Sequence, residues 1–196
     1  MLILFLLFAW LAGMVYASIP FYWFLIHPFS EHWQQWKKSP FRLLLPLWFL
    51  VIVVACAATW RWHAQSLYAP NVASSAIAVA LFVCGLLVYR RIGRFGVARF
   101  AGLAEVRPLE HEQLLVTSGM HARVRHPIYL AHLCMFLTWT VSSGLAILYF
   151  LSPAVLVLAT VMIRLEEREL QRRFGEAYRK YSECTPAILP FRLFPG

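Results

Sequence analysis

Two short polar segments carry the residues best suited to chemistry, and a long uncharged stretch separates them. The first reads S-G-M-H-A-R-V-R-H-P-I-Y over residues 118–129. Pro127 suits the first turn of a helix, where its missing N–H leaves no bond unmade. The free N–H groups of that turn, together with Arg125 and His126, predict a site for an anion such as a carboxylate or phosphate. The alternative is that these side chains anchor a helix at the lipid headgroups, with Tyr129 in the interfacial aromatic belt.

The second segment, residues 164–178, is dense in charge. Glu167 shares a helical face with apolar residues, and a carboxylate there needs a partner because burying an unpaired charge is costly. The alternative is that Glu166 and Glu167 form ordinary ion pairs with Arg164 and Arg168. Two further i,i+4 pairs are expected on a solvated face: Glu169 with Arg173, and Glu176 with Lys180.

No metal or nucleotide signature accompanies these segments. The cysteines are scattered without a C-x-x-C pair, and we expect no metal site because the best candidates lack regular ligand spacing: His121, His126, His132 and Cys134. Neither G-x-G-x-x-G nor G-x-x-x-x-G-K-[ST] occurs.

The composition indicates an integral membrane protein. Of the 196 residues, 61% are hydrophobic and 14% charged, and the mean hydropathy is +0.64. A soluble domain carries roughly 25% charged residues, so a water-soluble enzyme, a disordered chain and a coiled coil are excluded. The net charge of +9 comes from residues in loops between apolar stretches, so we expect no nucleic-acid partner.

The elements that must position the two polar segments are helices, and we predict an all-α fold of about five transmembrane spans. Residues 1–89 hold three spans, and 90–126 form a basic segment. Residues 127–163 are uncharged and would make about 55 Å of helix, nearly twice a hydrocarbon core of ~30 Å. We therefore expect a helical hairpin that turns at 142–144. Residues 164–196 form the C-terminal segment, which contains an amphipathic helix. The three N-terminal spans are expected within 1–26, 43–60 and about 72–89.

Charge predicts the orientation. The segments 27–42, 90–126 and 164–196 hold 17 of the 18 Lys and Arg residues, and Arg61 lies opposite. By the positive-inside rule these segments face the cytoplasm, so the chain is N-out and C-in. We expect one domain over 1–196, in the inner membrane of a bacterium or the endoplasmic reticulum of a eukaryote.

The two polar segments together resemble the isoprenylcysteine carboxyl methyltransferase family, and related membrane phospholipid methyltransferases share much of the pattern. The first motif is S-G-x-x-x-x-V-R-H-P-x-Y, and the second is R-x-E-E-x-x-L-x-x-x-F-G-x-x-Y-x-x-Y before a Pro-rich tail. The resemblance covers about residues 114–192.

This resemblance implies a methyltransferase that uses S-adenosylmethionine without a Rossmann domain and acts on a lipid-like or small hydrophobic acceptor that enters from the bilayer. It implies cofactor binding by Gly119, Arg125, His126, Tyr129, Glu166 and Glu167, with Arg164 orienting the acceptor and Glu167 holding Arg164. In-line transfer from a sulfonium needs mainly alignment. A carboxylate acceptor needs no general base, whereas an amine must lose a proton, and no residue stands out in the sequence as that base.

Three other functions remain. A phospholipid N-methyltransferase of the phosphatidylethanolamine type shares the pattern. Membrane sterol reductases have a similar C-terminal pattern with a nicotinamide cofactor, but they need many more spans. A non-enzymatic protein could bind anionic lipid through the basic cytoplasmic face.

Overall fold

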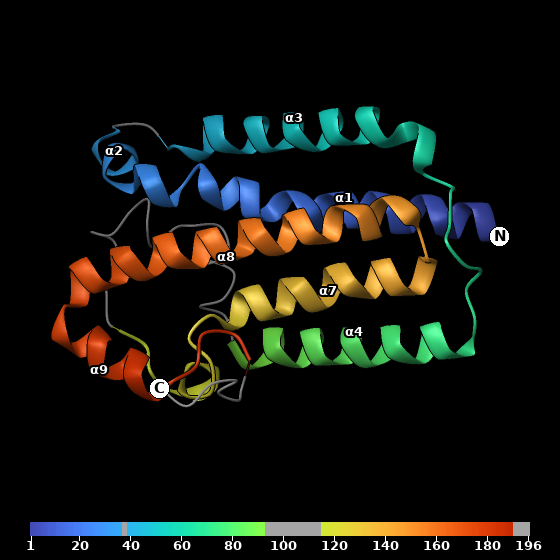
Figure 1. Ribbon diagram of the computed structural model, residues 1–196. Coiled ribbons are helices and arrows are strands. Elements are labelled where there is room, and N and C mark those ends of the chain that lie inside the picture. The colour runs from blue at the N-terminus through green and yellow to red at the C-terminus, as the bar shows by residue number, and fades with distance from the viewer. Residues whose placement is uncertain (37–38, 93–114, 190–196) are drawn as a thin grey trace.

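The computed structural model describes residues 1–36, 39–92 and 115–189, and its long helices lie side by side (Figure 1). The N-terminus and the turn between α7 and α8 lie at one end of the molecule, and α2 and α9 lie at the other. The long helices are α1 (Leu2–Phe24), α3 (Phe41–Thr59), α4 (Val72–Ile92), α7 (Pro127–Ser143) and α8 (Ala146–Phe174). The short ones are η1 (His27–Phe29), α2 (Ser30–Gln35), η2 (Trp60–Trp62), η4 (Gly119–Ala122) and α9 (Glu176–Cys184).

The described residues contain helices and no strand, which confirms the all-α prediction for this part of the chain. Four helical stretches are long and apolar enough to cross a membrane: Leu2–Phe29, Phe41–Trp62, Val72–Ile92 and Ala146–Phe174. With 17 residues, α7 is shorter, about 26 Å at 1.5 Å per residue. The predicted count of five spans and the N-out, C-in orientation therefore stay predictions.

A tight turn joins α7 to α8, at the place where the uncharged stretch was expected to fold back. Pro127 occupies the first turn of α7, and Gly144 ends that helix with φ of +65°. A side chain at Gly144 would be strained by this backbone and would also meet the Tyr68 carbonyl oxygen 2.6 Å from its Cβ. The turn thus depends on glycine for both backbone and space.

The last membrane helix continues beyond its uncharged part. The predicted boundary at residue 164, between the hairpin and the C-terminal segment, lies within α8, which runs without a break to Phe174. Gly175, with φ of +51°, then turns the chain into α9. The polar residues of the second motif therefore project from the rigid end of α8.

Apolar side chains cover both the interior and the outside of the helical layer. Inside, the end of α1 packs on α7 and α8 through Trp23, Ile26, Tyr129 and Met162. Outside, α3 presents residues such as Phe49 and Val54 to the surroundings, as a lipid-facing helix does.

Parts of the predicted basic segment and tail lie outside the described residues. The segment 90–126 is described at both ends but not over 93–114, and the tail is described to residue 189.

Candidate active site

The two polar motifs meet where α7 begins and α8 continues past its uncharged part. Arg125 donates from Nε to Glu167 Oε1 at 2.9 Å, and its Nη2 binds the same oxygen. His126 bridges both acidic residues, with Nε2 3.2 Å from Glu167 Oε1 and Nδ1 3.4 Å from Glu166 Oε2. We call Arg125, His126, Glu166 and Glu167 the polar cluster. Side chains about 40 residues apart in sequence therefore form one charged network.

The C-terminal segment holds the first motif in place. The backbone N–H groups of Arg125 and His126 donate to the carbonyls of Pro186 and Ala187, both at 2.9 Å. The Arg125 side chain also donates to the carbonyls of Ser182, at 2.9 Å, and Thr185. Arg125 is consequently bound on one side by Glu167 and on the other by the turn after α9.

The cluster fixes the charge of His126. Its side chain is 2% exposed, and this burial alone would lower the pKa of the imidazole, but the facing carboxylates of Glu166 and Glu167 raise that pKa to about 9. His126 is therefore an imidazolium at neutral pH. With Arg125, it places two cations against two carboxylates.

Aromatic and polar residues from α1 and α7 extend the cluster. Tyr129 stands beside Glu166, and its ring contacts the edge of His126 at 5.7 Å and of Trp23 at 5.0 Å between centroids. His27 Nδ1 lies 3.1 Å from Glu169 Oε2, with the His27 side chain only 2% exposed. Sequence reasoning missed Trp23 and His27 because nothing in the local pattern links the end of α1 to α8.

Two predicted site residues lie apart from the cluster. Gly119 is exposed in η4, and a Cβ built there would meet nothing within 4 Å. Arg164 is exposed on α8, and within the described residues no ion pair or hydrogen bond of its side chain to Glu167 is formed. Of the proposed cofactor-binding residues, the structure brings together Arg125, His126, Tyr129, Glu166 and Glu167.

Two of the simpler ion-pair interpretations were wrong. Glu166 and Glu167 bind His126 and Arg125 across the hairpin rather than Arg164 and Arg168 on their own helix. Glu176 pairs with Arg179 at 2.6 Å instead of Lys180.

The predicted pair of Glu169 with Arg173 forms, at 3.5 Å. It does not lie on a purely solvated face, because the same carboxylate also binds the buried His27.

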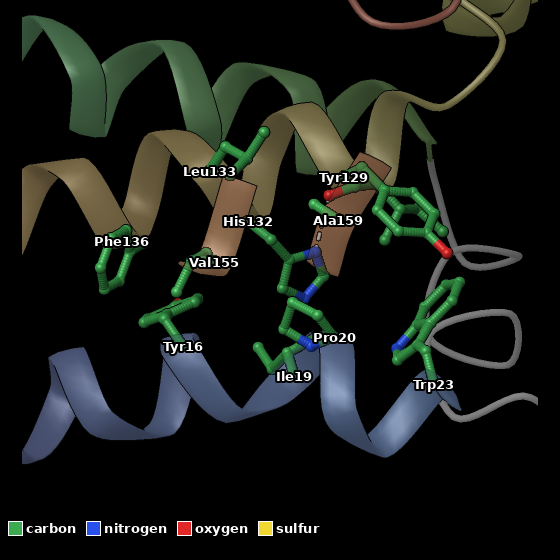
Figure 2. Close-up of a pocket in the computed structure, with 11 residues that line it drawn as sticks. Tyr16, Ile19, Pro20, Trp23, Tyr129, His132, Leu133, Phe136, Val155 and Ala159 are labelled. Carbon is green, nitrogen blue, oxygen red and sulfur yellow. Dashed lines mark hydrogen bonds between the residues drawn. The ribbon is translucent and has the colours of Figure 1, made fainter. Parts of the chain in front are cut away.

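A small cavity adjoins the cluster on the side of the membrane helices (Figure 2). Its walls come from α1, α7 and α8, and most of them are apolar. Tyr129 and Trp23 belong to both the cavity wall and the surroundings of the cluster. The end of the helical layer thus combines a charged site with an aromatic-lined space next to it.

Comparison with known proteins agrees with the resemblance of the motifs. The phospholipid methyltransferase family model matches residues 71–177, more than half of the chain. The chain is also 36% identical over 97 residues to the Delta(14)-sterol reductase TM7SF2 of Mus musculus, which covers 46% of this chain and 22% of that protein. The chain thus spans about a fifth of the length of this relative. No solved structure shows significant similarity. The matched region contains all four residues of the polar cluster, and the chain belongs to the phospholipid methyltransferase family, within the isoprenylcysteine carboxyl methyltransferase-like superfamily.

Proposed function

We propose that this protein is an integral membrane methyltransferase that uses S-adenosylmethionine to methylate a lipid-like or small hydrophobic acceptor. The observation that carries the proposal is the polar cluster, which joins both family motifs at the end of an apolar helical layer. Charged side chains are costly to keep beside the apolar helices of a membrane protein. A network of two cations and two carboxylates in such a place therefore marks a functional site.

The donor set fits S-adenosylmethionine. Arg125 and His126 are suited to the methionine carboxylate, and Glu166 and Glu167 to the amino group or the ribose hydroxyls. In the structure these side chains bind one another, so the ligand must replace some of these contacts. Glu167 is the most accessible of them, with 27% of its side chain exposed against 13% for Arg125. We expect Glu167 to exchange partners first.

The protein contributes alignment rather than bond activation. When bound, S-adenosylmethionine supplies a methyl group already activated on a sulfonium sulfur. Glu166, Tyr129 and His126 are positioned to fix the cofactor's orientation beside the membrane helices, and this restriction is worth several powers of ten in rate. Arg164, exposed on the same helix, is free to attract an anionic acceptor such as a lipid phosphate. We place this site at the cytoplasmic face, in accordance with the positive-inside rule.

Two acceptor classes fit this proposal equally. A carboxylate acceptor, as in isoprenylcysteine methylation, needs no proton acceptor. An amine acceptor, as in phospholipid N-methylation, needs one. The family match favours a membrane methyltransferase without choosing between them.

The similarity to a sterol reductase supports a second candidate function, reduction of a hydrophobic substrate with a nicotinamide cofactor. The same charged cluster could bind the phosphates of such a cofactor through Arg125 and His126. A non-enzymatic protein that binds anionic lipid is the third candidate. It predicts that the cluster matters for stability alone.

Ligand binding and product formation distinguish these functions. The purified protein in neutral detergent is titrated with S-adenosylmethionine or NADPH while its thermal unfolding is followed. Stabilisation by S-adenosylmethionine, with transfer of labelled methyl into extracted lipids or a prenylcysteine analogue, supports the proposal. Stabilisation by NADPH alone contradicts it.

Glu167→Gln should abolish both responses to S-adenosylmethionine. Glu176→Gln is the matched control, because Glu176 forms an exposed ion pair with Arg179 away from the cluster. If neither ligand stabilises the wild type or either variant, the lipid-binding function is favoured.

A further inference from the structure

The turn η1, which follows α1, buries a histidine against the charged part of α8. This residue is His27, whose side chain is 2% exposed and whose Nδ1 lies 3.1 Å from Glu169 Oε2. Because a carboxylate can only accept, Nδ1 carries the proton of this hydrogen bond. His27 thus binds α8 from the side of α1, whereas Arg125 and His126 bind it from the beginning of α7.

Three carboxylates lie within four residues of α8, and their mutual repulsion has to be offset. They belong to Glu166, Glu167 and Glu169, and between 18% and 27% of each side chain is exposed. Like charges one helical turn apart repel each other, and Glu166 and Glu169 are so placed. Glu169 binds His27 at 3.1 Å and the more exposed Arg173 at 3.5 Å. His27 is the nearer partner, and it also contributes to the electrostatic environment of Glu166.

A series of ring contacts joins His27 to the polar cluster. The distances between ring centroids are 5.2 Å from His27 to Trp23, 5.0 Å from Trp23 to Tyr129 and 5.7 Å from Tyr129 to His126. Figure 2 shows Trp23 and Tyr129 at the same end of the cavity, and Tyr129 also interacts with Glu166. Packed rings leave little free volume, so His27 cannot shift without moving the rings beside Glu166.

Other contacts hold the turn η1 in place without His27. Trp33 Nε1 donates to the carbonyl of Leu25 at 2.7 Å. Ile26 is 1% exposed and packs in the same apolar cluster as Met162 of α8. An apolar side chain at position 27 would serve this packing, whereas a buried imidazole is costly unless it is paired. The hydrogen bond of His27 to Glu169 therefore indicates a role beyond packing.

We propose that His27 is a positioning residue of the cofactor site, which holds Glu169 and the adjoining Glu166 in place while the cofactor binds. The proposal rests on the methyltransferase function proposed above. When Arg125 and His126 turn to the carboxylate of the cofactor, the carboxylates of α8 lose part of their compensation. His27 keeps its hydrogen bond to Glu169 at this stage, because it lies on the other side of α8. The N-terminal part of the chain thereby supports S-adenosylmethionine binding, although it lies outside the region that matches the family.

The affinity for S-adenosylmethionine tests this role. The full-length protein in neutral detergent is dialysed against labelled S-adenosylmethionine, and methyl transfer is measured in parallel. His27→Ala should weaken binding about tenfold, the loss expected for one hydrogen bond. It should raise the KM for S-adenosylmethionine by the same factor and leave kcat within about twofold, because the lost interaction acts on binding. His27→Asn places an amide N–H near the position of Nδ1, and should bind within about threefold of the wild type.

Trp33→Phe is the matched control from the same part of the chain. It removes the hydrogen bond to the Leu25 carbonyl and leaves the contact of His27 with Glu169 in place. It should lower the unfolding midpoint and leave the KM for S-adenosylmethionine unchanged. A purely structural role of His27 would give this same pattern, since a loss of folded protein lowers the apparent kcat alone. An unchanged affinity and KM in His27→Ala would therefore overturn the proposal.

A double-mutant cycle tests whether His27 acts through Glu169. The variant that combines His27→Ala with Glu169→Ala should bind S-adenosylmethionine no more weakly than the weaker single variant. Additive losses would mean that the two residues act separately, and would overturn the proposal. If His27→Ala does not fold, Glu169→Ala replaces it in the binding assay. Wild-type affinity in Glu169→Ala would then overturn the proposal, and a loss of about tenfold would support it.

The wild type separates this proposal from the function on which it rests. If the wild type does not bind S-adenosylmethionine, the methyltransferase function fails, and the role of His27 fails with it. If the wild type binds the cofactor and transfers methyl while His27→Ala does so with the same KM, the positioning role alone is refuted.

Discussion

Replacing Glu167 by glutamine tests whether the polar cluster is a cooperative charged network. The substitution keeps the shape of the side chain but leaves Arg125 and His126 with one carboxylate fewer. Removing one partner of a buried ion pair typically costs 3–5 kcal/mol. Glu167 retains partial exposure, and Arg125 keeps its bonds to the carbonyls of Ser182 and Thr185. We therefore expect Glu167→Gln to lower the free energy of unfolding by about 2–3 kcal/mol.

The assay is reversible unfolding in mixed detergent, followed by tryptophan fluorescence, with Glu176→Gln as the control. Glu176 is exposed, with 56% of its side chain accessible, and its replacement should leave the unfolding midpoint unchanged. A double-mutant cycle with Arg125→Gln should give a coupling energy of about 1–3 kcal/mol between the two positions. If Glu167→Gln is no less stable than Glu176→Gln, or if the cycle is additive, the two residues do not stabilise each other and the reasoning fails.

Three further predictions address His126, two glycines and Arg164. Because folding raises the pKa of His126 from 6.5 to about 9, its pairing should stabilise the fold fully below pH 6.5 and be lost as the pH rises through 9. The unfolding midpoint measured against pH should show a loss of up to about 3 kcal/mol, which His126→Gln removes. Gly119→Ala should lower the free energy of unfolding by about 1 kcal/mol, because its backbone has a positive φ. Gly144→Ala should lower it clearly more, because the new Cβ would also meet the Tyr68 carbonyl. Unfolding of the two variants under the same conditions checks this. Arg164→Gln should leave the unfolding midpoint unchanged but reduce methyl transfer to an anionic acceptor more than to a neutral one.

The helices could be predicted from the sequence because the length of an apolar run is a strong constraint in a membrane. The expected spans 1–26, 43–60 and 72–89 correspond to α1, α3 and α4 with shifts of a few residues at their ends. The turn at Gly144 followed from arithmetic, since the uncharged stretch was too long for one span. The charged residues from 164 onward mark the end of the apolar run but not the end of α8, because a helix that leaves the membrane keeps its hydrogen bonds and needs no break at the boundary.

The polar contacts were predictable only in part. The need of Glu167 for a partner followed from its place on an apolar face, but the partner expected for it was Arg164, and the structure pairs it with Arg125 and His126 instead. The contact of Glu169 with His27 joins positions 142 residues apart, so no local spacing could reveal it.

A choice between two nearby cations was also beyond the sequence. Glu176 can reach Arg179 or Lys180 from the first turn of α9. Glu176 pairs with Arg179, which donates two hydrogen bonds, from Nε at 2.8 Å and from Nη2 at 2.6 Å. The planar guanidinium can donate to both carboxylate oxygens at once, whereas an ammonium cannot do so in the same geometry. The sequence spacing shows that both cations can reach Glu176, but it does not show which of them forms the better hydrogen bonds.

The cavity beside the polar cluster is built in part from a segment that the family match does not cover. The polar cluster lies entirely within residues 71–177, the region that matches the family. Four of the eleven residues that line the cavity, Tyr16, Ile19, Pro20 and Trp23, come from α1 and lie outside that region. A protein can therefore share the family's charged motifs and still present a different cavity wall. For this reason the family match alone leaves the acceptor open, and substitutions of Tyr16 or Ile19 should change acceptor preference while leaving S-adenosylmethionine binding intact.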